Sequence, residues 1–418
     1  MRAASRAATC ALTLSLFASN PGFAQGPSND APAASFRLRT SVKATGLLSR
    51  APDAPLLFPE RVGGESMWRV RAEPEITAGA RAVFTLAYEQ RVRLTSGTAG
   101  VTTAGILPSQ GAAPFRIRQL DWTIARSSGV SWQHEIDRAS VQLQSGRASL
   151  TLGRQAIGWG RGVMFGAVDL FAPFSPLEVD REWRRGVDAA RADITLTDRS
   201  SLDLVGAFGN AWDRSAVGAR VRGYAGPIDV EFMGGRRARD LFAGVTSSAA
   251  VGNAGIHGEL AAFHVPDDGT SGGERTVWKG VAGGSYRFPI GAGILTYVEY
   301  HYSGFGAARP EDIVPLLSRA SFSERYLRGD TQILSRHAVA VIASYEPSPE
   351  LLFSGQWIQN PRDRSGILAP SLTLTLSDQA SIVGSLYLPY GRPPRGQLLR
   401  SEFGAAPLAA LMQLRLYL

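Results

Sequence analysis

Apolar and polar side chains alternate along much of this chain. In residues 408–418, leucine, alanine and methionine occupy every even position, whereas Gln413, Arg415 and Tyr417 fall on the odd positions. The same period of two recurs in residues 36–43, 82–93, 217–222, 228–232 and 371–377. Successive side chains of a strand point to opposite faces, so this period predicts strands with one apolar and one polar face.

Strands of this kind can build a soluble sandwich or a barrel with lipid outside and water inside. Aromatic residues near strand ends favour the barrel, because they are typical of the interfacial girdles of outer-membrane barrels. The candidates for these girdles are Tyr297, Tyr300, Tyr302, Trp357, Tyr387 and Tyr390. The predicted fold class is therefore all-β, an antiparallel transmembrane β-barrel over residues 25–418.

Short turns and long connections alternate strictly along the chain. Turns are predicted near 145–146, 198–199, 226–227, 252–253, 289–293, 347–349 and 378–379, and long connections at 157–186, 265–276, 305–334 and 391–406. This order predicts long outer loops and short periplasmic turns, with both chain ends on the periplasmic side. Counting gives 18 strands, with 16 as the alternative, and residues 116–126 are expected to be a hairpin arm above the membrane or a sign of miscounting.

The first 24 residues have the pattern of a secretory signal peptide: Arg2 and Arg6, an apolar run over 7–18, then Gly22-Phe23-Ala24. A membrane anchor is the alternative, but the run is shorter than the ~20 residues that span a bilayer. Cleavage would leave 394 residues (418 minus 24) and remove Cys10, the only cysteine, so no disulfide is expected. The predicted location is the outer membrane of a Gram-negative-type bacterium.

Arginine carries the positive charge of the chain. The formal net charge is +8, and only Lys43 and Lys279 among the 44 basic residues are lysine. The arginines are spread over many strands beside Asp and Glu, which argues against nucleic-acid binding. The five histidines show no metal-binding spacing. Neither a metal nor another cofactor is expected.

Residues 157–186 combine aromatic and charged side chains in a way that does not suit a free loop. If this stretch folds into the barrel mouth, its aromatic side chains are buried and its charged side chains stay hydrated. The composition therefore predicts a constriction or lid loop. An outer loop packed on its neighbours is the alternative. Candidate residues along the solute path are Arg161, Asp169, Arg181, Arg184 and Arg185, together with Arg220 and Arg222 on the predicted lumen parity. A mildly positive lumen would attract small anionic solutes.

A family resemblance rests on residues 134–196. The stretch "GRQAIGWG", the long insertion and the strand start "GVDAARADITL" resemble porin-like outer-membrane barrels related to the alginate-export family. The resemblance implies an eighteen-stranded channel for anionic substrates, with Arg154, Asp188 and Arg191 among its lumen residues. Two features depart from the family: lysine is scarce, and the chain ends in Leu418 where most such barrels end in Phe. The last strand is still expected to engage the barrel-assembly machinery.

Three motifs suggest other functions. "GTSGG" at 269–273 fits a nucleophile motif without the strand and helix that such a motif needs. His301 and Ser303 are similar to the His-x-Ser pair of outer-membrane phospholipases, although their parity points to the lumen. Arg328-Gly329-Asp330 could serve adhesion. The predicted function is a passive porin-like channel and not an enzyme, with a lipolytic enzyme or a structural or adhesive barrel as alternatives.

Overall fold

The structure is a computed structural model that describes residues 34–96, 105–107, 113–266 and 275–418. The predicted signal peptide and the motif at 269–273 lie outside the described residues. The strands are β1 (Ala34–Arg50), β2 (Val62–Ala78), β3 (Ala82–Ser96), β4 (Asp121–Ser127), β5 (Val130–Ser145), β6 (Ala148–Gln155), β7 (Val187–Thr197), β8 (Ser200–Ala207), β9 (Ala216–Ala225), β10 (Ile228–Arg237), β11 (Asp240–Val251), β12 (Ala254–Val265), β13 (Arg275–Phe288), β14 (Ile294–Ser303), β15 (His337–Ser348), β16 (Leu351–Gln359), β17 (Gly366–Ser377), β18 (Ala380–Tyr390) and β19 (Leu408–Tyr417). The helices are η1 (Trp212–Arg214), η2 (Pro310–Asp312), α2 (Ile313–Leu317), α3 (Ala320–Leu327) and η3 (Phe403–Ala405).

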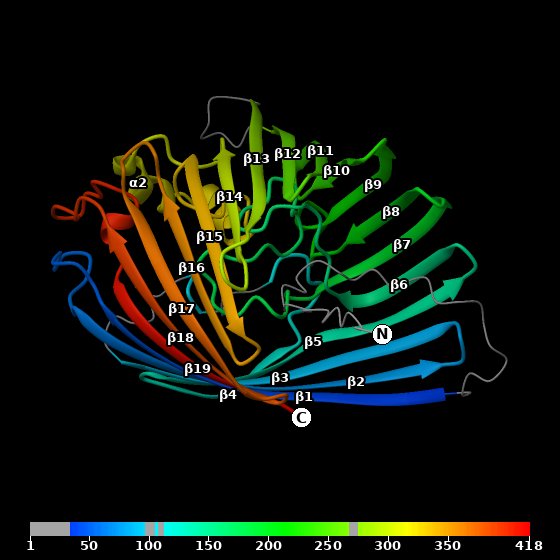
Figure 1. Cartoon of the computed structure of the whole chain (residues 1–418), viewed down its shortest axis with the longest axis horizontal. Coiled ribbons are helices and arrows are strands. Elements are labelled where there is room, and N and C mark those ends of the chain that lie inside the picture. The colour runs from blue at the N-terminus through cyan, green and yellow to red at the C-terminus, as the bar shows by residue number, and fades with distance from the viewer. Residues whose placement is uncertain (1–33, 97–104, 108–112, 267–274) are drawn as a thin grey trace, which may run out of the picture.

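The wall is a closed antiparallel barrel (Figure 1). Each strand of the wall pairs with the next in sequence, except that β3 pairs with β5. β19 closes the circle on β1, with Leu408 opposite Arg50 and Tyr417 opposite Ser41. Eighteen strands form this circle, which confirms the predicted number. Closure leaves no free sheet edge in the wall.

The nineteenth strand, β4, is the predicted hairpin arm. It pairs with the first part of β5, from Asp121 opposite Glu135 to Ser127 opposite Val130. The later part of β5, from Ala139 to Ser145, pairs with β6 instead. β4 therefore extends the sheet beyond the point where β6 ends and adds no strand to the circle.

Exposure alternates along the strands as the sequence period predicts. In β19, Leu408 and Met412 are 47% and 67% exposed, whereas Ala409 and Gln413 are 2% and 1% exposed. The even positions face outward and the odd positions face the interior. An apolar exterior and a polar interior are what a barrel wall in lipid requires.

The predicted aromatic girdle is wrong at two positions. Tyr387 faces the interior, is 2% exposed and donates a hydrogen bond to the carbonyl oxygen of Leu177. Tyr297 shares the inward parity of Glu299 in β14. Nearness to a strand end suggested the girdle, but parity decides which face a ring occupies. Trp357 and Tyr390 do face outward, and the indole N–H of Trp357 donates to the hydroxyl of Tyr390 at 2.8 Å.

Long connections gather at one end of the barrel, which we call the loop rim. They include 51–61 between β1 and β2, 156–186 between β6 and β7, 304–336 between β14 and β15, and 391–407 between β18 and β19. Connections at the opposite end, the turn rim, are short turns such as 146–147 and 378–379. The connection between β10 and β11, residues 238–239, also lies at the loop rim and is only two residues long. No helix in the described part of the chain is long and apolar enough to cross a membrane.

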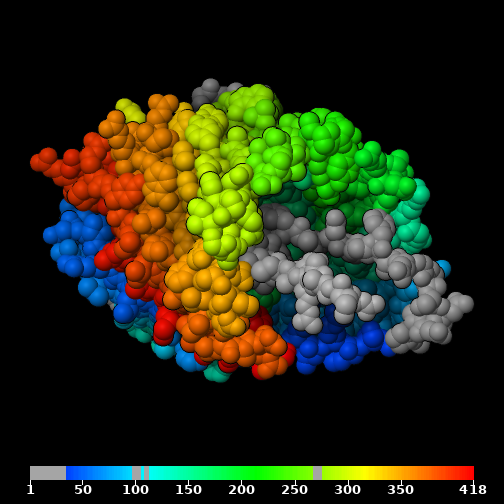
Figure 2. Space-filling model, in the orientation of Figure 1, coloured from blue at the N-terminus to red at the C-terminus, as the bar shows by residue number. Residues whose placement is uncertain are grey.

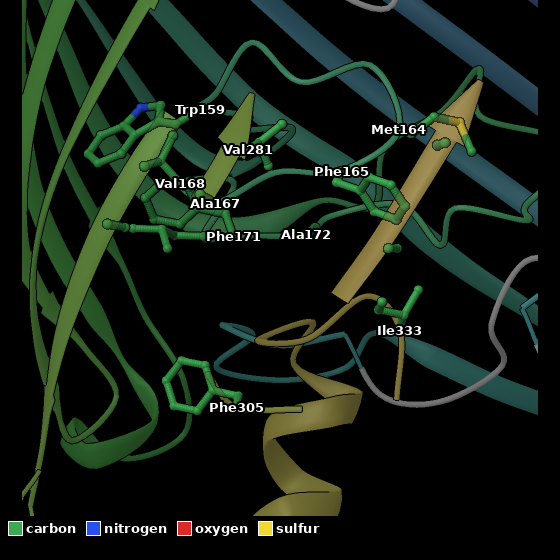
Figure 3. Close-up of a cluster of buried hydrophobic side chains, with 14 of the residues drawn as sticks. Trp159, Met164, Phe165, Ala167, Val168, Phe171, Ala172, Val281, Phe305 and Ile333 are labelled. Atoms are coloured by element: carbon green, nitrogen blue, oxygen red, sulfur yellow. The ribbon is translucent and has the colours of Figure 1, made fainter. Parts of the chain in front are cut away.

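The connection 156–186, which we call the inner segment, lies inside the barrel (Figure 1). Its apolar side chains form one buried cluster with inward-facing wall residues such as Phe242 and Phe263. Figure 3 shows part of this cluster, with Trp159, Val168 and Phe171 of the segment and Val281 of the wall. Trp159 and Phe171 meet edge to face with ring centroids 5.1 Å apart. Fully burying one such side chain is worth about 1.5–3 kcal/mol. The barrel therefore has a hydrophobic core of its own, built around this segment.

Candidate functional site

Two carboxylates on the wall bind the backbone of the inner segment. Glu259 of β12 accepts from the backbone N–H groups of Arg161, Gly162, Ala167 and Val168. Glu299 of β14 accepts from those of Val163, Met164 and Phe165. The remaining N–H in this stretch, that of Gly166, donates to the side-chain oxygen of Gln332. Every backbone donor from 161 to 168 is thus satisfied by a side chain, because the segment has no strand partner of its own.

Glycine makes this close approach possible. A Cβ at Gly162 would lie 1.7 Å from the carbonyl oxygen of Phe165, so a side chain cannot be accommodated there. At Gly160, φ is +104°, and an added Cβ would lie 2.9 Å from a carboxylate oxygen of Glu259. The glycines of "WGRG" therefore allow the chain to turn tightly over the two acids.

The other half of the inner segment is held by the opposite wall. The Lys43 ammonium lies 2.8 Å from Asp180 and 3.7 Å from the centroid of the Trp183 ring. Arg69 of β2 donates to Asp180 at 2.9 Å. Burial alone would raise the pKa of Asp180, but the Arg69 and Lys43 charges lower it below its usual value. Anchors on β1, β2, β12 and β14 thus fix the segment across the lumen.

Alternating acids and arginines surround a small space beside Trp183. Its lining residues are Arg69, Arg71, Glu89, Arg91, Glu135, Asp137, Glu178, Trp183 and Arg185, and its volume is about 20 Å³. A space of this size admits about one water-sized molecule. Burial raises the pKa of Glu178 to about 7, although the N–H of Ser175 and the Arg181 charge oppose the shift. Glu178 is therefore the acid of this cluster that titrates near neutral pH.

The candidate arginines of the inner segment mostly hold the segment itself. Arg161 pairs with Asp229 at 2.7 Å and with Glu231 at 2.9 Å, both on β10. Arg181 donates to the carbonyl oxygens of Val163 and Ser175. Arg184 donates to Asp169 at 2.6 Å and to the carbonyl oxygen of Ala172. Only Arg185 of this set lies in the space beside Trp183.

The candidate solute-path residues on the barrel strands form two groups. Arg154 and Asp188 bind each other, with 2.7 Å between Nε and Oδ1. Arg154 also donates to the carbonyl oxygen of Ile136, and Asp188 accepts from the N–H of Ile117. This pair ties the chain before β4 to the ends of β6 and β7. The second group faces the lumen: Arg191 and Arg220 pair with Asp203, and Arg222 pairs with Asp229.

Sequence reasoning missed the anchors Glu259 and Glu299. A signal was present: the wall neighbours of Glu259 are Thr246 and Val281, and those of Glu299 are Gly283 and Ala340. Neither acid therefore has a base directly across from it in the wall. By contrast, Glu231 lies opposite Arg222. An inward acid without a cross-strand base indicates a partner in the lumen.

The connection 304–336 lies against the inner segment. Arg237 at the end of β10 donates to the carbonyl oxygen of Leu170 and pairs with Asp330. Asp330 is 1% exposed and also binds Arg325 and Arg328. The Arg328-Gly329-Asp330 tripeptide thus has its acid buried inside a cluster of arginines.

His301 and Ser303 face the interior and are both 0% exposed. Phe165 of the inner segment stacks on the His301 ring with centroids 4.8 Å apart. Neither side chain reaches the lipid-facing surface. No group of His, Cys, Asp and Glu that could hold a metal ion occurs among the described residues.

The fold resembles that of solved outer-membrane porins of the Occ/OprD type. Acinetobacter baumannii OccAB4 aligns with a TM-score of 0.54 and 8% identity, covering 92% of this chain and 98% of that one. Pseudomonas aeruginosa OccK7 (OpdD) aligns at 0.51 and 7%, covering 92% and 98%, and A. baumannii OccAB1 at 0.51 and 10%, covering 91% and 96%. No family model matches the sequence, and no curated protein does. The class of structure is therefore an eighteen-stranded porin-type barrel.

Proposed function

We propose that this protein is a porin-like channel of the outer membrane of a Gram-negative-type bacterium, with the loop rim facing outward. Small solutes cross it passively, without a cofactor. The observation that carries this proposal is the closed wall with an apolar exterior and an interior lined by charged side chains. The likeness of fold to Occ-type porins supports it.

The inner segment is the constriction in this proposal. It is anchored on opposite walls through Lys43 and Arg69 on one side and through Glu259 and Glu299 on the other. Solutes that cross the barrel have to pass this segment. The passage is consequently narrow, which restricts the channel to small solutes.

A modest preference for anions follows from unequal exposure within the lumen ion pairs. The side chain of Arg222 is 33% exposed and its partner Asp229 is 11% exposed. Arg220 is 19% exposed against 5% for Asp203. Solution in the lumen therefore meets guanidinium groups more than carboxylates, and guanidinium suits carboxylate or phosphate solutes. Arg191 is 22% exposed against 5% for Asp203, but its second partner, Asp193, is 43% exposed, so the argument rests on Arg220 and Arg222.

A relation to barrels of the alginate-export family belongs to this proposal. Its support is the hairpin, insertion and strand start over residues 134–196. Among the positions carried over from the resemblance, Arg191 faces the lumen and pairs with Asp203. Arg154 and Asp188 bind each other and nearby backbone, so these two positions serve the architecture of the hairpin and not solute contact.

The alternative functions are less well supported by the geometry. Lipolysis needs a nucleophile that reaches lipid, whereas Ser303 and His301 lie beneath Phe165 inside the barrel. Adhesion through Asp330 would need this acid at the surface, where it is not. The C-terminal strand β19 closes the wall on β1, and we propose it as the element that the barrel-assembly machinery recognises.

Reversal potentials across a planar bilayer under a salt gradient test the anion preference. The wild type is expected to be modestly anion-selective, and Arg220→Gln/Arg222→Gln should reduce that selectivity. Arg147→Gln is the matched control, because Arg147 lies on a turn and faces Asp198 at 3.8 Å with 68% exposure. Cation selectivity in the wild type, or an equal effect of the control, would contradict the proposal.

A further inference from the structure

The lipid-facing wall carries an apolar groove of about 970 Å³. It is lined mainly by outward-facing residues of β16, β17, β18, β19, β1, β2 and β3. Small residues form its middle: Gly384, Ala410, Gly46 and Gly64. Larger side chains border it, with Phe353 and Leu372 on one side and Leu94 on the other, exposed at 46%, 41% and 43%.

The groove is wider than a single acyl chain. Seven neighbouring strands at ~4.8 Å spacing span about 29 Å. Most of its lining positions lie in the half of the wall nearer the loop rim, since Leu48 is two residues from the end of β1 at Arg50 and Ala410 is two from the start of β19 at Leu408. Whatever fills the groove therefore lies against the leaflet at that rim.

Directly above the groove, the loop rim presents exposed arginines. The connection 360–365, between β16 and β17, carries Arg362 and Arg364. The connection 391–407, between β18 and β19, carries Arg392, Arg395 and Arg400. Figure 2 shows the red connection between β18 and β19 beside the blue one between β1 and β2 at the left edge of the molecule. In the described residues, no acid lies within ion-pair distance of these five guanidinium groups.

The acids of the same two connections are turned to other partners. Asp363 accepts from the hydroxyl and the N–H of Ser365 and from the N–H of Glu402. Glu402 accepts from the backbone N–H groups of Leu334 and Ser335. The lumen arginines are paired with acids, whereas these rim arginines are left to solvent. Their charge is available to an external anion.

We propose that the groove and the arginine rim together bind a glycolipid with several acyl chains and more than one phosphate group. The acyl chains occupy the apolar groove. The phosphates at the loop rim accept from the guanidinium groups, whose planar fork matches phosphate oxygens. The breadth of the groove and the number of rim arginines favour such a lipid over an ordinary phospholipid with one phosphate.

The test is native mass spectrometry of the whole detergent-solubilised protein after incubation with one of three probes. These are bisphosphorylated lipid A, phosphatidylglycerol with one phosphate, and zwitterionic phosphatidylcholine. Lipid A is expected to remain bound at least severalfold more than either phospholipid. Equal retention of lipid A and phosphatidylglycerol would overturn the proposal.

Two sets of variants examine the two parts of the site. Arg392→Gln/Arg395→Gln/Arg400→Gln should lower lipid A retention by roughly tenfold or more, since each arginine near an anionic surface contributes appreciably. The control is Arg214→Gln/Arg239→Gln/Arg319→Gln, which removes exposed arginines from other connections of the same rim. Equal loss in both sets would reduce the effect to nonspecific charge and overturn the site.

Gly46→Leu/Gly384→Leu fills the groove, because a Cβ at either glycine meets nothing within 4 Å. This variant should lose lipid A, whereas Gly223→Leu, at an equally open position on β9, should retain it. Retention in the groove variant would contradict the assignment. If the wild type is instead an oligomer that Gly46→Leu/Gly384→Leu dissociates, a second copy of the chain occupies the groove and the lipid proposal is wrong.

Discussion

Replacing Glu259 by glutamine should free the inner segment while leaving the barrel intact. The variant keeps the size of the side chain but removes its charge and one of its two acceptor oxygens. Glu259 serves four backbone donors, those of Arg161, Gly162, Ala167 and Val168. The wall itself does not depend on this carboxylate, because β12 pairs with β11 and β13 through backbone hydrogen bonds.

The size of the effect follows from these bonds. A glutamine oxygen can accept two of the four N–H groups and leaves two buried donors without an acceptor. Each unsatisfied donor costs about 1–3 kcal/mol, so the packed state of the segment should lose about 2–6 kcal/mol. Glu299 still holds three further N–H groups, which should keep the opening local.

Limited proteolysis in detergent measures this opening. Glu259→Gln should be cut within residues 156–186 faster than the wild type, and its single-channel conductance in a planar bilayer should be larger. Glu75→Gln is the matched control, because Glu75 faces the largely exposed Arg37 at 3.9 Å, a pair that contributes little. Unchanged cleavage and conductance in Glu259→Gln would refute the view that this carboxylate holds the segment.

Two further predictions follow from the wall and from the cluster beside Trp183. Leu374→Arg should impair membrane assembly more than Thr375→Arg, because Leu374 faces lipid, where an arginine costs up to about 2–4 kcal/mol, the value at mid-depth. Heat-modifiable migration on a gel measures the assembled fraction. Equal damage in the two variants would mean that the faces are assigned wrongly. The pKa of Glu178 in the packed segment is raised to about 7. The neutral form of Glu178 therefore favours the packed segment, and the stability that this form contributes is lost as the pH rises to 7. Proteolysis of the segment should therefore increase from about pH 4.5, the ordinary pKa of a glutamate, to about pH 7 and level off above it, by a free-energy change on the order of 3 kcal/mol in all. Glu178→Gln should flatten this pH profile. A wild-type profile as flat as that of the variant would contradict this role.

Much of the wall could be predicted from the sequence, because a period of two is a local property. It gives the number of wall strands and the face that most of their side chains occupy. For β4 the sequence left two interpretations open, a hairpin arm or a miscounted strand. The strands extend further than the clean alternation, with β1 running from Ala34 to Arg50 where the alternation spans 36–43. Cross-strand pairing carries regular structure beyond the stretch in which the alternation is clean.

The partners of lumen side chains could not be predicted in the same way. Parity places Arg220 and Glu259 inside, but it does not say what each one meets. Glu259 binds residues about a hundred positions earlier in the chain, and such a contact exists only after the barrel closes. Similarly, Arg181 and Arg184 were expected to face the solute path and instead bind their own segment. Long-range polar contacts depend on the three-dimensional path of the inner segment. The alternation of apolar and polar residues does not predict this path.

Single-channel recording of the purified, refolded protein in a planar bilayer tests the central claim most directly. A passive channel narrowed by the inner segment should give discrete current steps that are linear in voltage, with a larger step size in Glu259→Gln. Heat-modifiable migration of the same sample establishes that the barrel is closed. A closed barrel that yields no current steps, in the wild type and in Glu259→Gln alike, would contradict the proposed channel function.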